Sequence, residues 1–232
     1  MSISLKPRRL LFEYTQAGLV AVIFALFVRT FLFQPFTIPT PSMEDTLLVG
    51  DYILVNKFVL ASLVNPLERA ILPVADIRRG DVIVFRSPHD ESQDYVKRAI
   101  GLPGDTIEVR EGALFINGAA VTTSEPQLLL RRAHPHGREF ARRYEETLPD
   151  GRRHAVHDLT DGGQFDNFGP YVVPAGHVFF MGDNRDNSLD SRWSGMGGAP
   201  VENLIGRAEI VYATGLESCA RDHTVACPMP RW

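Results

Sequence analysis

The most uniform hydrophobic stretch of the chain lies near its N-terminus. Residues 17–28 contain no charged side chain, and a second apolar group ends at Phe33. A helix needs ~20 largely apolar residues to cross the ~30 Å hydrocarbon core of a bilayer. That length is reached only if Arg29 is included, whose long side chain can reach the headgroups from near a helix end. The pattern therefore predicts a transmembrane helix within residues 1–35.

Basic residues precede this run, and a short polar, proline-containing sequence follows it. Because positive charge flanks the cytoplasmic end of a membrane helix, Lys6, Arg8 and Arg9 predict a cytoplasmic N-terminus and an exported remainder. A cleaved signal peptide is a second interpretation, but residues 34–39 contain no small-x-small cleavage site. A buried helix of a soluble protein is a third, although the run has no polar face. The pattern favours a single-pass anchor.

After residue 40, short runs of β-branched and aromatic residues alternate with glycine, proline and aspartate, as is typical of strands and turns. The predicted strands cover residues 47–49, 52–59, 81–85, 95–100, 106–109, 114–116, 177–181 and 208–212. Asn117-Gly118 is a hairpin turn signal. Residues 60–72 and 124–132 are short helix candidates. The predicted fold class is mainly β, with an N-terminal transmembrane helix followed by an antiparallel β domain that carries an inserted smaller lobe.

The proposed insert differs in composition from the sequence around it. Seven arginines lie between Arg131 and Arg153, interleaved with acids, and Pro149-Asp-Gly151 indicates a hairpin. These arginines can face anionic lipid headgroups or form a solvated surface of mixed charge, which is the commoner outcome. The predicted division is 1–35 for the N-terminus and anchor, 36–118 for the first part of the β core, 119–170 for the inserted lobe, 171–215 for the second part of the core and 216–232 for a tail.

Composition and charge mainly exclude classes of protein, in particular a disordered chain and a nucleic-acid-binding protein. The 232 residues are 44% hydrophobic and 22% charged, which is ordinary for a globular protein. A net charge of −4 gives no basic field for nucleic acid, so no nucleic-acid partner is predicted. Cys219 and Cys227 are too far apart for a Cys-x-x-Cys motif, and a disulfide and two free thiols stay equally open.

Ser42, in Pro39-Thr-Pro-Ser-Met43, follows the predicted anchor closely and is the candidate nucleophile. A serine nucleophile needs a base within hydrogen-bond reach, most often a histidine. The histidines lie in the polar insert, in loops, at a strand start or in the tail, and nothing selects one. Lys97 is better placed, because burial in a predicted strand would lower its pKa from ~10.4 toward neutrality. Lys57, in a comparable strand, is the second choice.

Residues 182–192, Gly-Asp-Asn-Arg-Asp-Asn-Ser-Leu-Asp-Ser-Arg, follow a predicted strand and favour a rigid hydrogen-bonded loop. Their carboxylates also suggest calcium, but the EF-hand pattern fails at Arg185, Ser188 and Ser194, where a carboxylate or amide, a glycine and a glutamate are needed. A less regular metal site and a histidine cluster in the insert are minor alternatives. We predict no metal and no cofactor.

These three segments, behind an N-terminal anchor, resemble the bacterial type I signal peptidases, membrane-bound serine proteases that remove signal peptides from exported proteins. The resemblance covers residues 36–57, 80–109 and 179–208. It implies that Ser42 is the nucleophile and Lys97 the general base. The Thr40 hydroxyl and the Ser42 backbone N–H would form the oxyanion hole.

The resemblance also implies supporting roles. Ser188 would orient the lysine amine, and Asp190 with Arg192 would form an ion pair that holds the loop. The residues that fall where the family binds small substrate side chains and encloses the site are Phe36, Ile38, Tyr95, Val96, Met43 and Leu47. We expect Val96, Ala99 and Ile100 to provide part of the apolar wall around Lys97.

Two residues beside Ser42 depart from the family pattern, Pro41 in place of glycine and Asp45 in place of proline. Pro41 pushes Thr40 into an extended conformation, which an oxyanion donor can adopt, and Asp45 can support the turn by side-chain hydrogen bonds.

The function expected is a single-pass serine endopeptidase with a Ser-Lys dyad, which cleaves signal peptides at the outer face of the bacterial cytoplasmic membrane. Its partners would be preprotein signal peptides and membrane lipids. The alternatives are a dedicated Ser-Lys peptidase for conjugation or pilin substrates, and a non-catalytic anchored periplasmic binding domain.

Overall fold

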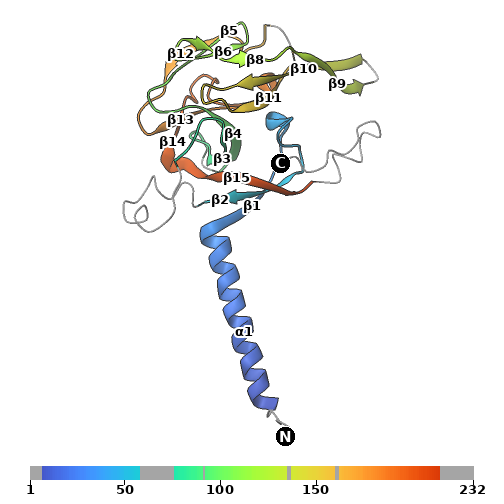
Figure 1. Cartoon of the computed structure of the whole chain (residues 1–232), viewed down its shortest axis with the longest axis vertical. Coiled ribbons are helices and arrows are strands. Elements are labelled where there is room, and N and C mark those ends of the chain that lie inside the picture. The colour runs from blue at the N-terminus through green and yellow to red at the C-terminus, as the bar shows by residue number, and fades with distance from the viewer. Residues whose placement is uncertain (1–6, 58–75, 91, 135–136, 160–161, 215–232) are drawn as a thin grey trace.

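The structure, a computed structural model of the chain, describes residues 7–57, 76–90, 92–134, 137–159 and 162–214. A long helix projects from a body built mainly of antiparallel strands (Figure 1). The predicted fold class, mainly β with one apolar N-terminal helix, is confirmed. The helix candidate at 60–72 and both cysteines lie outside the described residues.

Helix α1 (Pro7–Phe27) continues through a π-helical turn (Val28–Leu32) directly into strand β1 (Phe33–Thr37). At ~1.5 Å per residue, the helix extends over ~30 Å, which matches the hydrocarbon core of a bilayer. Its segment Leu10–Phe27 has a mean hydropathy of 1.8, and none of it is buried against the rest of the chain. By length and composition α1 can cross a membrane, and Arg29 lies just beyond it.

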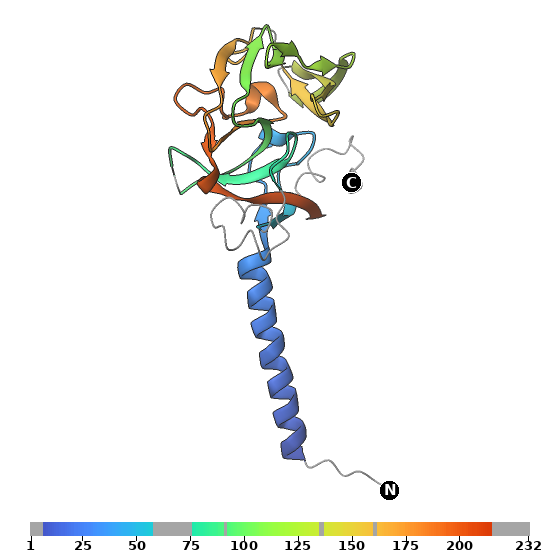
Figure 2. The same cartoon turned by 60° about the vertical axis from the view of Figure 1, so that its left-hand side comes forward.

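The remaining strands are β2 (Tyr52–Asn56), β3 (Val82–Arg86), β4 (Asp94–Gly101), β5 (Thr106–Arg110), β6 (Ala113–Ile116), β7 (Ala119–Ala120), β8 (Thr122–Thr123), β9 (Gln127–His134), β10 (Gly137–Thr147), β11 (Arg153–Asp158), β12 (Phe168–Val172), β13 (His177–Met181), β14 (Ala199–Pro200) and β15 (Leu204–Ala213). A seven-stranded sheet has the order β1-β2-β15-β3-β4-β13-β14. A second sheet has the order β11-β10-β8, with β9 also paired to β10, and a third the order β12-β5-β6-β7. β1, β2 and β15 lie next to α1, and the other two sheets lie at the far end of the body (Figure 1, Figure 2).

Two predicted elements are wrong. Residues 47–49 form a loop instead of a strand, because their backbone is satisfied locally: the N–H of Leu48 donates to the Asp51 carboxylate over 2.8 Å. The segment 124–132 is not a helix, because β9 pairs there with β10. Its leucines and arginines have high helix propensity, which tertiary pairing overrides.

Both predicted hairpin turns are confirmed. Asn117 and Gly118 join β6 to β7 with φ angles of 54° and 78°, the left-handed pair that a two-residue hairpin loop requires. Residues 149–151 lie between the antiparallel strands β10 and β11, and Gly151 has a φ of 84°. The second turn closes the β10–β11 hairpin.

The third sheet joins strands from both sides of the predicted boundary at residue 118. β5 and β6 precede that boundary, and β6 pairs with β7 while β5 pairs with β12. The insert therefore shares a sheet with the sequence before it. The domain division stays a prediction.

Apolar side chains of the described residues pack in three clusters. The first, which joins the large sheet to the third sheet, contains Ile100, Ile107, Val109, Leu114, Ile116, Leu148, Val173, Phe179 and Met181. The second, the Phe85 cluster, contains Ile83, Phe85, Ala99, Val178, Phe180 and Ala199. The third, the Met43 cluster, contains Ile38, Met43, Leu47, Ile53, Val55 and Val84.

The Phe85 cluster generates a stability prediction. The rings of Phe85 and Phe180 stack with centroids 4.3 Å apart, and both side chains are fully buried. We expect Phe180→Ala to lower the free energy of unfolding by about 3–5 kcal/mol, because it leaves a cavity that a close-packed core fills only partly. Denaturant unfolding of the detergent-solubilised protein measures this.

Phe115→Ala is the matched control, since it removes an equal ring that is only partly buried. Its cost should be less than half as large. Equal losses in the two variants would contradict the packing assigned to Phe180.

Candidate active site

Ser42 lies on a short 3-10 turn, Pro41–Met43, that follows β1. Thr40, just before the turn, has φ −130° and ψ 152°, so the extended conformation expected from Pro41 is confirmed. Met43 anchors the other side of the turn in the Met43 cluster. Ser42 is thus held between a fixed backbone and a packed side chain.

Lys97 comes from β4, where it lies opposite Ile83 of β3. Its Nζ donates a hydrogen bond to Oγ of Ser42 over 2.5 Å, and both residues are buried. Thr40 Oγ1 lies 3.3 Å from the same serine oxygen. Two residues 55 positions apart in sequence therefore meet through their functional atoms.

The apolar wall around Lys97 differs in part from the expectation. Side chains alternate along a strand, so Tyr95 and Ala99 share its face, and both belong with the Phe85 cluster. Val96 packs against the Met43 cluster and Ile100 belongs to the first cluster. Of the three expected wall residues, Ala99 lies on the face of Lys97.

The environment of Lys97 favours the neutral amine. Burial lowers the pKa of Lys97 from 10.5 to about 8. The carboxylates of Asp190 and Asp183 oppose this shift, and Arg192 adds to it. Near pH 8, a large fraction of the amine can accept a proton.

The loop 182–192 packs directly behind these two residues. The backbone N–H of Asn184 donates to the Ser42 carbonyl over 3.1 Å, and its side-chain amide donates to the Pro41 carbonyl over 3.0 Å. A Cβ added at Gly182 would lie 2.2 Å from Oγ of Ser188 and 2.6 Å from the Ser42 carbonyl oxygen. Only glycine fits at that position without moving the loop or the turn.

Asp190 and Arg192 form a buried ion pair. Nη2 and Nε of Arg192 lie 2.8 and 2.9 Å from the two Asp190 oxygens, and the Gly182 N–H donates to the same carboxylate over 2.9 Å. Burial raises the pKa of Asp190, but Arg192 and the Gly182 N–H outweigh it and hold the pKa below its ordinary value. Ser188 is buried, its Oγ has no hydrogen-bond partner among the described residues, and its role toward Lys97 stays a prediction.

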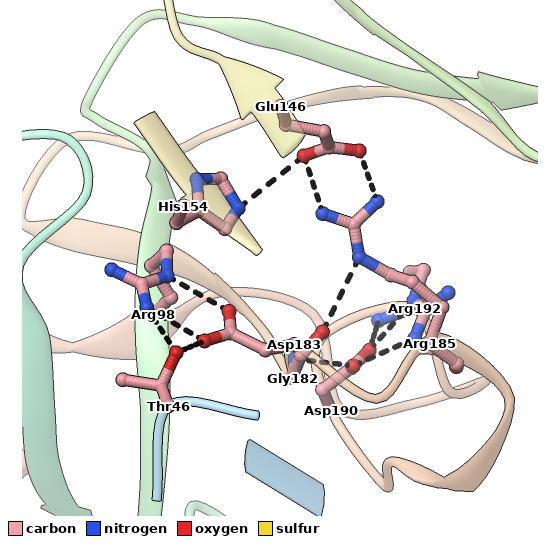
Figure 3. A network of polar contacts seen from close by, with 9 residues as sticks. All are labelled: Thr46, Arg98, Glu146, His154, Gly182, Asp183, Arg185, Asp190 and Arg192. Carbon is pink, nitrogen blue, oxygen red and sulfur yellow. Dashed lines mark hydrogen bonds and ion pairs between the residues drawn. The ribbon is translucent and has the colours of Figure 1, made fainter. Parts of the chain in front are cut away.

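A second set of buried charges, which the sequence analysis missed, extends from this loop (Figure 3). Arg98 binds Asp183 over 2.8 and 2.6 Å, and Thr46 donates to the same carboxylate over 2.5 Å. Glu146 of β10 binds Arg185 through two hydrogen bonds of 2.6 Å. The one signal available in the sequence was the acid and base content of the loop, which does not reveal distant partners.

A cleft of about 730 Å³ opens at Ser42. Its lining residues are Ile38, Pro39, Thr40, Pro41, Ser42, Met43, Gln93, Asp94, Tyr95, Val96, Lys97, Gln164, Phe165, Asp186, Asn187, Ser188, Leu189 and Trp193. Four of the predicted substrate residues, Ile38, Met43, Tyr95 and Val96, are among them. Phe36 and Leu47 pack in or against the Met43 cluster. Gln164, Phe165 and Trp193 are additional lining residues that the sequence analysis did not select.

The other candidate bases lie elsewhere. Lys57 follows the end of β2, where its backbone N–H bonds to the Leu32 carbonyl over 3.0 Å. His154 and His157 belong to β11, and His154 Nε2 lies 3.4 Å from Glu146. The recorded partners of the Ser42 hydroxyl are Lys97 and Thr40.

Three carboxylates, Asp158, Asp166 and Asp186, lie together with oxygen atoms within 4.8 Å of one another, and Asp186 also lines the cleft. Burial, together with Asp186 and Asp166, raises the pKa of Asp158 to about 6 against the opposing effect of Arg142. We assign no metal to it.

The sequence is similar to known proteins along most of its length. The sequence model of the family described as signal peptidase, peptidase S26, matches residues 11–213. The chain belongs to this family. Membership supports a peptidase that cleaves signal peptides.

Curated relatives agree along most of the chain. The signal peptidase I of Pseudomonas fluorescens is 39% identical over 217 residues, which cover 90% of this chain and 74% of that protein. The signal peptidase I of Pseudomonas aeruginosa is 37% identical over the same coverage. That of Rickettsia typhi is 36% identical over 202 residues, covering 81% of this chain and 75% of the relative.

The burial of Lys97 predicts a stability effect with a defined pH dependence. The pKa of Lys97 is near 10.5 in the unfolded chain and about 8 in the folded one. Below pH 8, burial of the charged amine therefore lowers the free energy of unfolding by about 3 kcal/mol. Between these values the unfolded state binds more protons, and stability rises with pH. Lys97→Met should therefore raise the free energy of unfolding by about 2–3 kcal/mol at pH 7, a gain that shrinks toward pH 10.

Denaturant unfolding at several pH values measures this gain. The same exchange at Lys57, a partly exposed lysine, is the control. A Lys97→Met variant that is less stable than the wild type at pH 7, or a difference that does not change with pH, would contradict the buried-charge account.

Proposed function

We propose that this chain is a membrane-anchored serine endopeptidase that cleaves signal peptides after small residues, with Ser42 as nucleophile and Lys97 as general base. The observation that carries the proposal is the 2.5 Å contact between Nζ of Lys97 and Oγ of Ser42 in a buried setting. A neutral amine at this distance can accept the serine proton as Oγ attacks a carbonyl carbon.

The reaction would follow in two steps. Oγ of Ser42 bonds to the scissile carbonyl carbon while its proton moves to Lys97 Nζ. Collapse of the tetrahedral intermediate breaks the C–N bond, and the Lys97 ammonium returns the proton to the leaving amine. In the second step Lys97 takes a proton from water as the water oxygen bonds to the acyl carbon. Collapse of this second tetrahedral intermediate breaks the bond between that carbon and Oγ of Ser42, the Lys97 ammonium returns its proton to Oγ, and the signal peptide leaves with a free carboxylate.

The oxyanion needs hydrogen-bond donors near Ser42. The Thr40 hydroxyl, 3.3 Å from Oγ, and the Ser42 backbone N–H are the proposed donors. One such donor contributes ~3–4 kcal/mol of transition-state stabilisation. The extended Thr40 backbone supports its part in this assignment.

The cleft supports recognition of an extended substrate. β13 pairs with β4 only at residues 98–101, so in the described sheet the backbone edge of residues 94–97 faces the cleft beside Ser42. β1 is the edge strand of the large sheet, and the residues after it form the opposite wall. A substrate strand bound by β-augmentation would present alternate side chains to Ile38, Met43 and Val96.

Membrane attachment is part of the proposal. Helix α1 is long and apolar enough to cross a bilayer, and the basic residues at its start favour a cytoplasmic N-terminus. The catalytic domain would then lie on the outer face of the cytoplasmic membrane, in contact with lipids and near emerging preproteins. Residues 1–35, 36–118, 119–170, 171–215 and 216–232 stay the proposed divisions.

The deciding experiment incubates the detergent-solubilised chain with a preprotein that ends its signal peptide in Ala-x-Ala. Ser42→Ala and Lys97→Met should each lower kcat by at least ~10⁴-fold, because the nucleophile or its base is absent. Ser124→Ala and Lys57→Met are the matched controls and should retain activity. Undiminished cleavage by Ser42→Ala or Lys97→Met would remove the mechanism.

The pH profile of the wild type is a second test. The reacting form needs Lys97 neutral, so kcat/KM should rise with pH through an apparent pKa of about 8 and fall away below it. An acid limb near pH 6.5 would indicate a histidine base instead.

Protease accessibility tests the membrane orientation. In spheroplasts, protease is added outside under conditions that partly unfold the β domain. Because this domain is expected on the outer face of the membrane, it should be digested, and only the segment around α1 should stay protected. Intact cells are the control. Full protection of the β domain in spheroplasts, with digestion only after lysis, would place the domain in the cytoplasm and reject the orientation.

A further inference from the structure

We propose that the β10–β11 hairpin, part of the predicted insert, positions the active site by holding two loops, the one after Ser42 and the one from Gly182 to Ser188. The proposal rests on the proposed function, since its readout is cleavage. Its residues touch no reacting atom and are positioning residues.

The first contact holds the loop behind Lys97. Glu146 of β10 binds both terminal nitrogens of Arg185 over 2.6 Å, and the pair is almost completely buried. Arg185 Nε in turn donates to the Gly182 carbonyl over 3.3 Å. His154 of β11 lies 3.4 Å from the same glutamate (Figure 3). The guanidinium group of Arg185 is therefore bound both by Glu146 of β10 and by the Gly182 carbonyl of its own loop.

The backbone of β11 and of Leu159, the residue that follows it, holds the same loop. The His157 N–H donates to the Asp183 carbonyl over 2.8 Å, and the Leu159 N–H donates to the Asp186 carboxylate over 2.8 Å. Between these two points lies Asn184, which bonds to the Ser42 and Pro41 carbonyls. A displacement of β11 would therefore move Asn184, which is bonded directly to the backbone of Ser42 and Pro41.

The second contact holds the segment that follows Ser42. Asp45 forms a hydrogen-bonded ion pair with Arg143 of β10, and its carboxylate lies 3.7 Å from Nε2 of His157 of β11. His157 and Arg143 outweigh burial and hold the pKa of Asp45 well below its ordinary value. The Asp45 carboxylate thus binds the segment after Ser42 to both strands of the hairpin.

We expect these ion pairs to fix the positions of the two loops rather than to add net stability to the fold. A buried ion pair often stabilises a fold no more than an apolar replacement would, because desolvation offsets the Coulomb attraction. It does fix the geometry of its partners. Catalysis depends on that geometry, since a shift of ~1 Å between reacting groups can cost ~100-fold in rate.

The Asp45–Arg143 pair offers the cleaner test, because both side chains are about one-quarter exposed and their loss leaves no fully buried charge. We expect Asp45→Asn and Arg143→Gln each to lower kcat about tenfold, with KM within about twofold of the wild type. The double variant should lose no more than either single variant, because the contact is already broken. Arg143→Lys should recover most of the rate. The assay uses the full chain in detergent with the Ala-x-Ala preprotein.

Arg110→Gln is the matched control, because it breaks an exposed ion pair with Glu108 on β5, remote from the cleft. Its kcat should equal that of the wild type. Unchanged kcat in both Asp45→Asn and Arg143→Gln, or losses that multiply in the double variant, would overturn the positioning role. An inactive wild type would reject the proposed function instead, so the two failures are distinguishable.

Glu146→Gln tests the other contact. It keeps the shape of the side chain and leaves Arg185 without its carboxylate, so some unfolding is expected. The folded fraction is measured by near-ultraviolet circular dichroism, and kcat is expressed per folded molecule. A loss of at least about tenfold per folded molecule supports the role, and an unchanged value overturns it. If the variant does not fold, the Asp45–Arg143 cycle decides alone.

Discussion

The structure depends on one requirement, that a lysine amine be kept out of water and in contact with a serine hydroxyl. Lys97 can meet it only within a strand whose neighbours are apolar, and Tyr95, Ala99 and Ile83 supply those neighbours. The Phe85 cluster is therefore more than general packing. It provides the low-polarity surroundings that bring the pKa of a lysine toward the range in which the amine can act as a base.

The charges around this amine make the requirement harder to meet. Asp183 and Asp190 both raise the pKa of Lys97 by attracting its proton. Each carboxylate is bound by an arginine, Arg98 for Asp183 and Arg192 for Asp190, and Arg192 itself lowers the lysine pKa. The acids of the loop 182–192 accept backbone and side-chain hydrogen bonds that hold the loop, and Arg192 limits their effect on the pKa of Lys97.

The sequence predicts the parts of the candidate site that are local in character. The place of Ser42 after an apolar segment, the setting of Lys97 in a strand and the density of short polar residues at 182–192 each select a residue or loop without knowledge of distant partners. The contacts of Glu146 with Arg185 and of Arg98 with Asp183 were missed because each joins residues that are far apart in sequence, so only the pairing of strands and the packing of loops decide them. The same cause explains β9, where pairing with β10 overrides helix propensity, and the wall of Lys97, where alternation along β4 sends Val96 and Ile100 to other clusters.

A short, continuous stretch of backbone connects the proposed membrane anchor to Ser42. Helix α1 runs through the π-helical turn into β1, which pairs with β2 along its whole length, from Phe33 opposite Asn56 to Thr37 opposite Tyr52. Ile38 continues the attachment through a 2.9 Å bond from its N–H to the Asp51 carbonyl. Because a fully extended chain advances at most ~3.6 Å per residue, Ser42 lies within ~36 Å of Leu32, the last residue of the π-helical turn. An anchor that crosses the bilayer would therefore limit the height of the serine above it, and a peptide bond a few residues beyond another membrane-embedded apolar segment would lie within the same range. The position of the nucleophile would thus contribute to substrate choice together with the small pockets of the cleft.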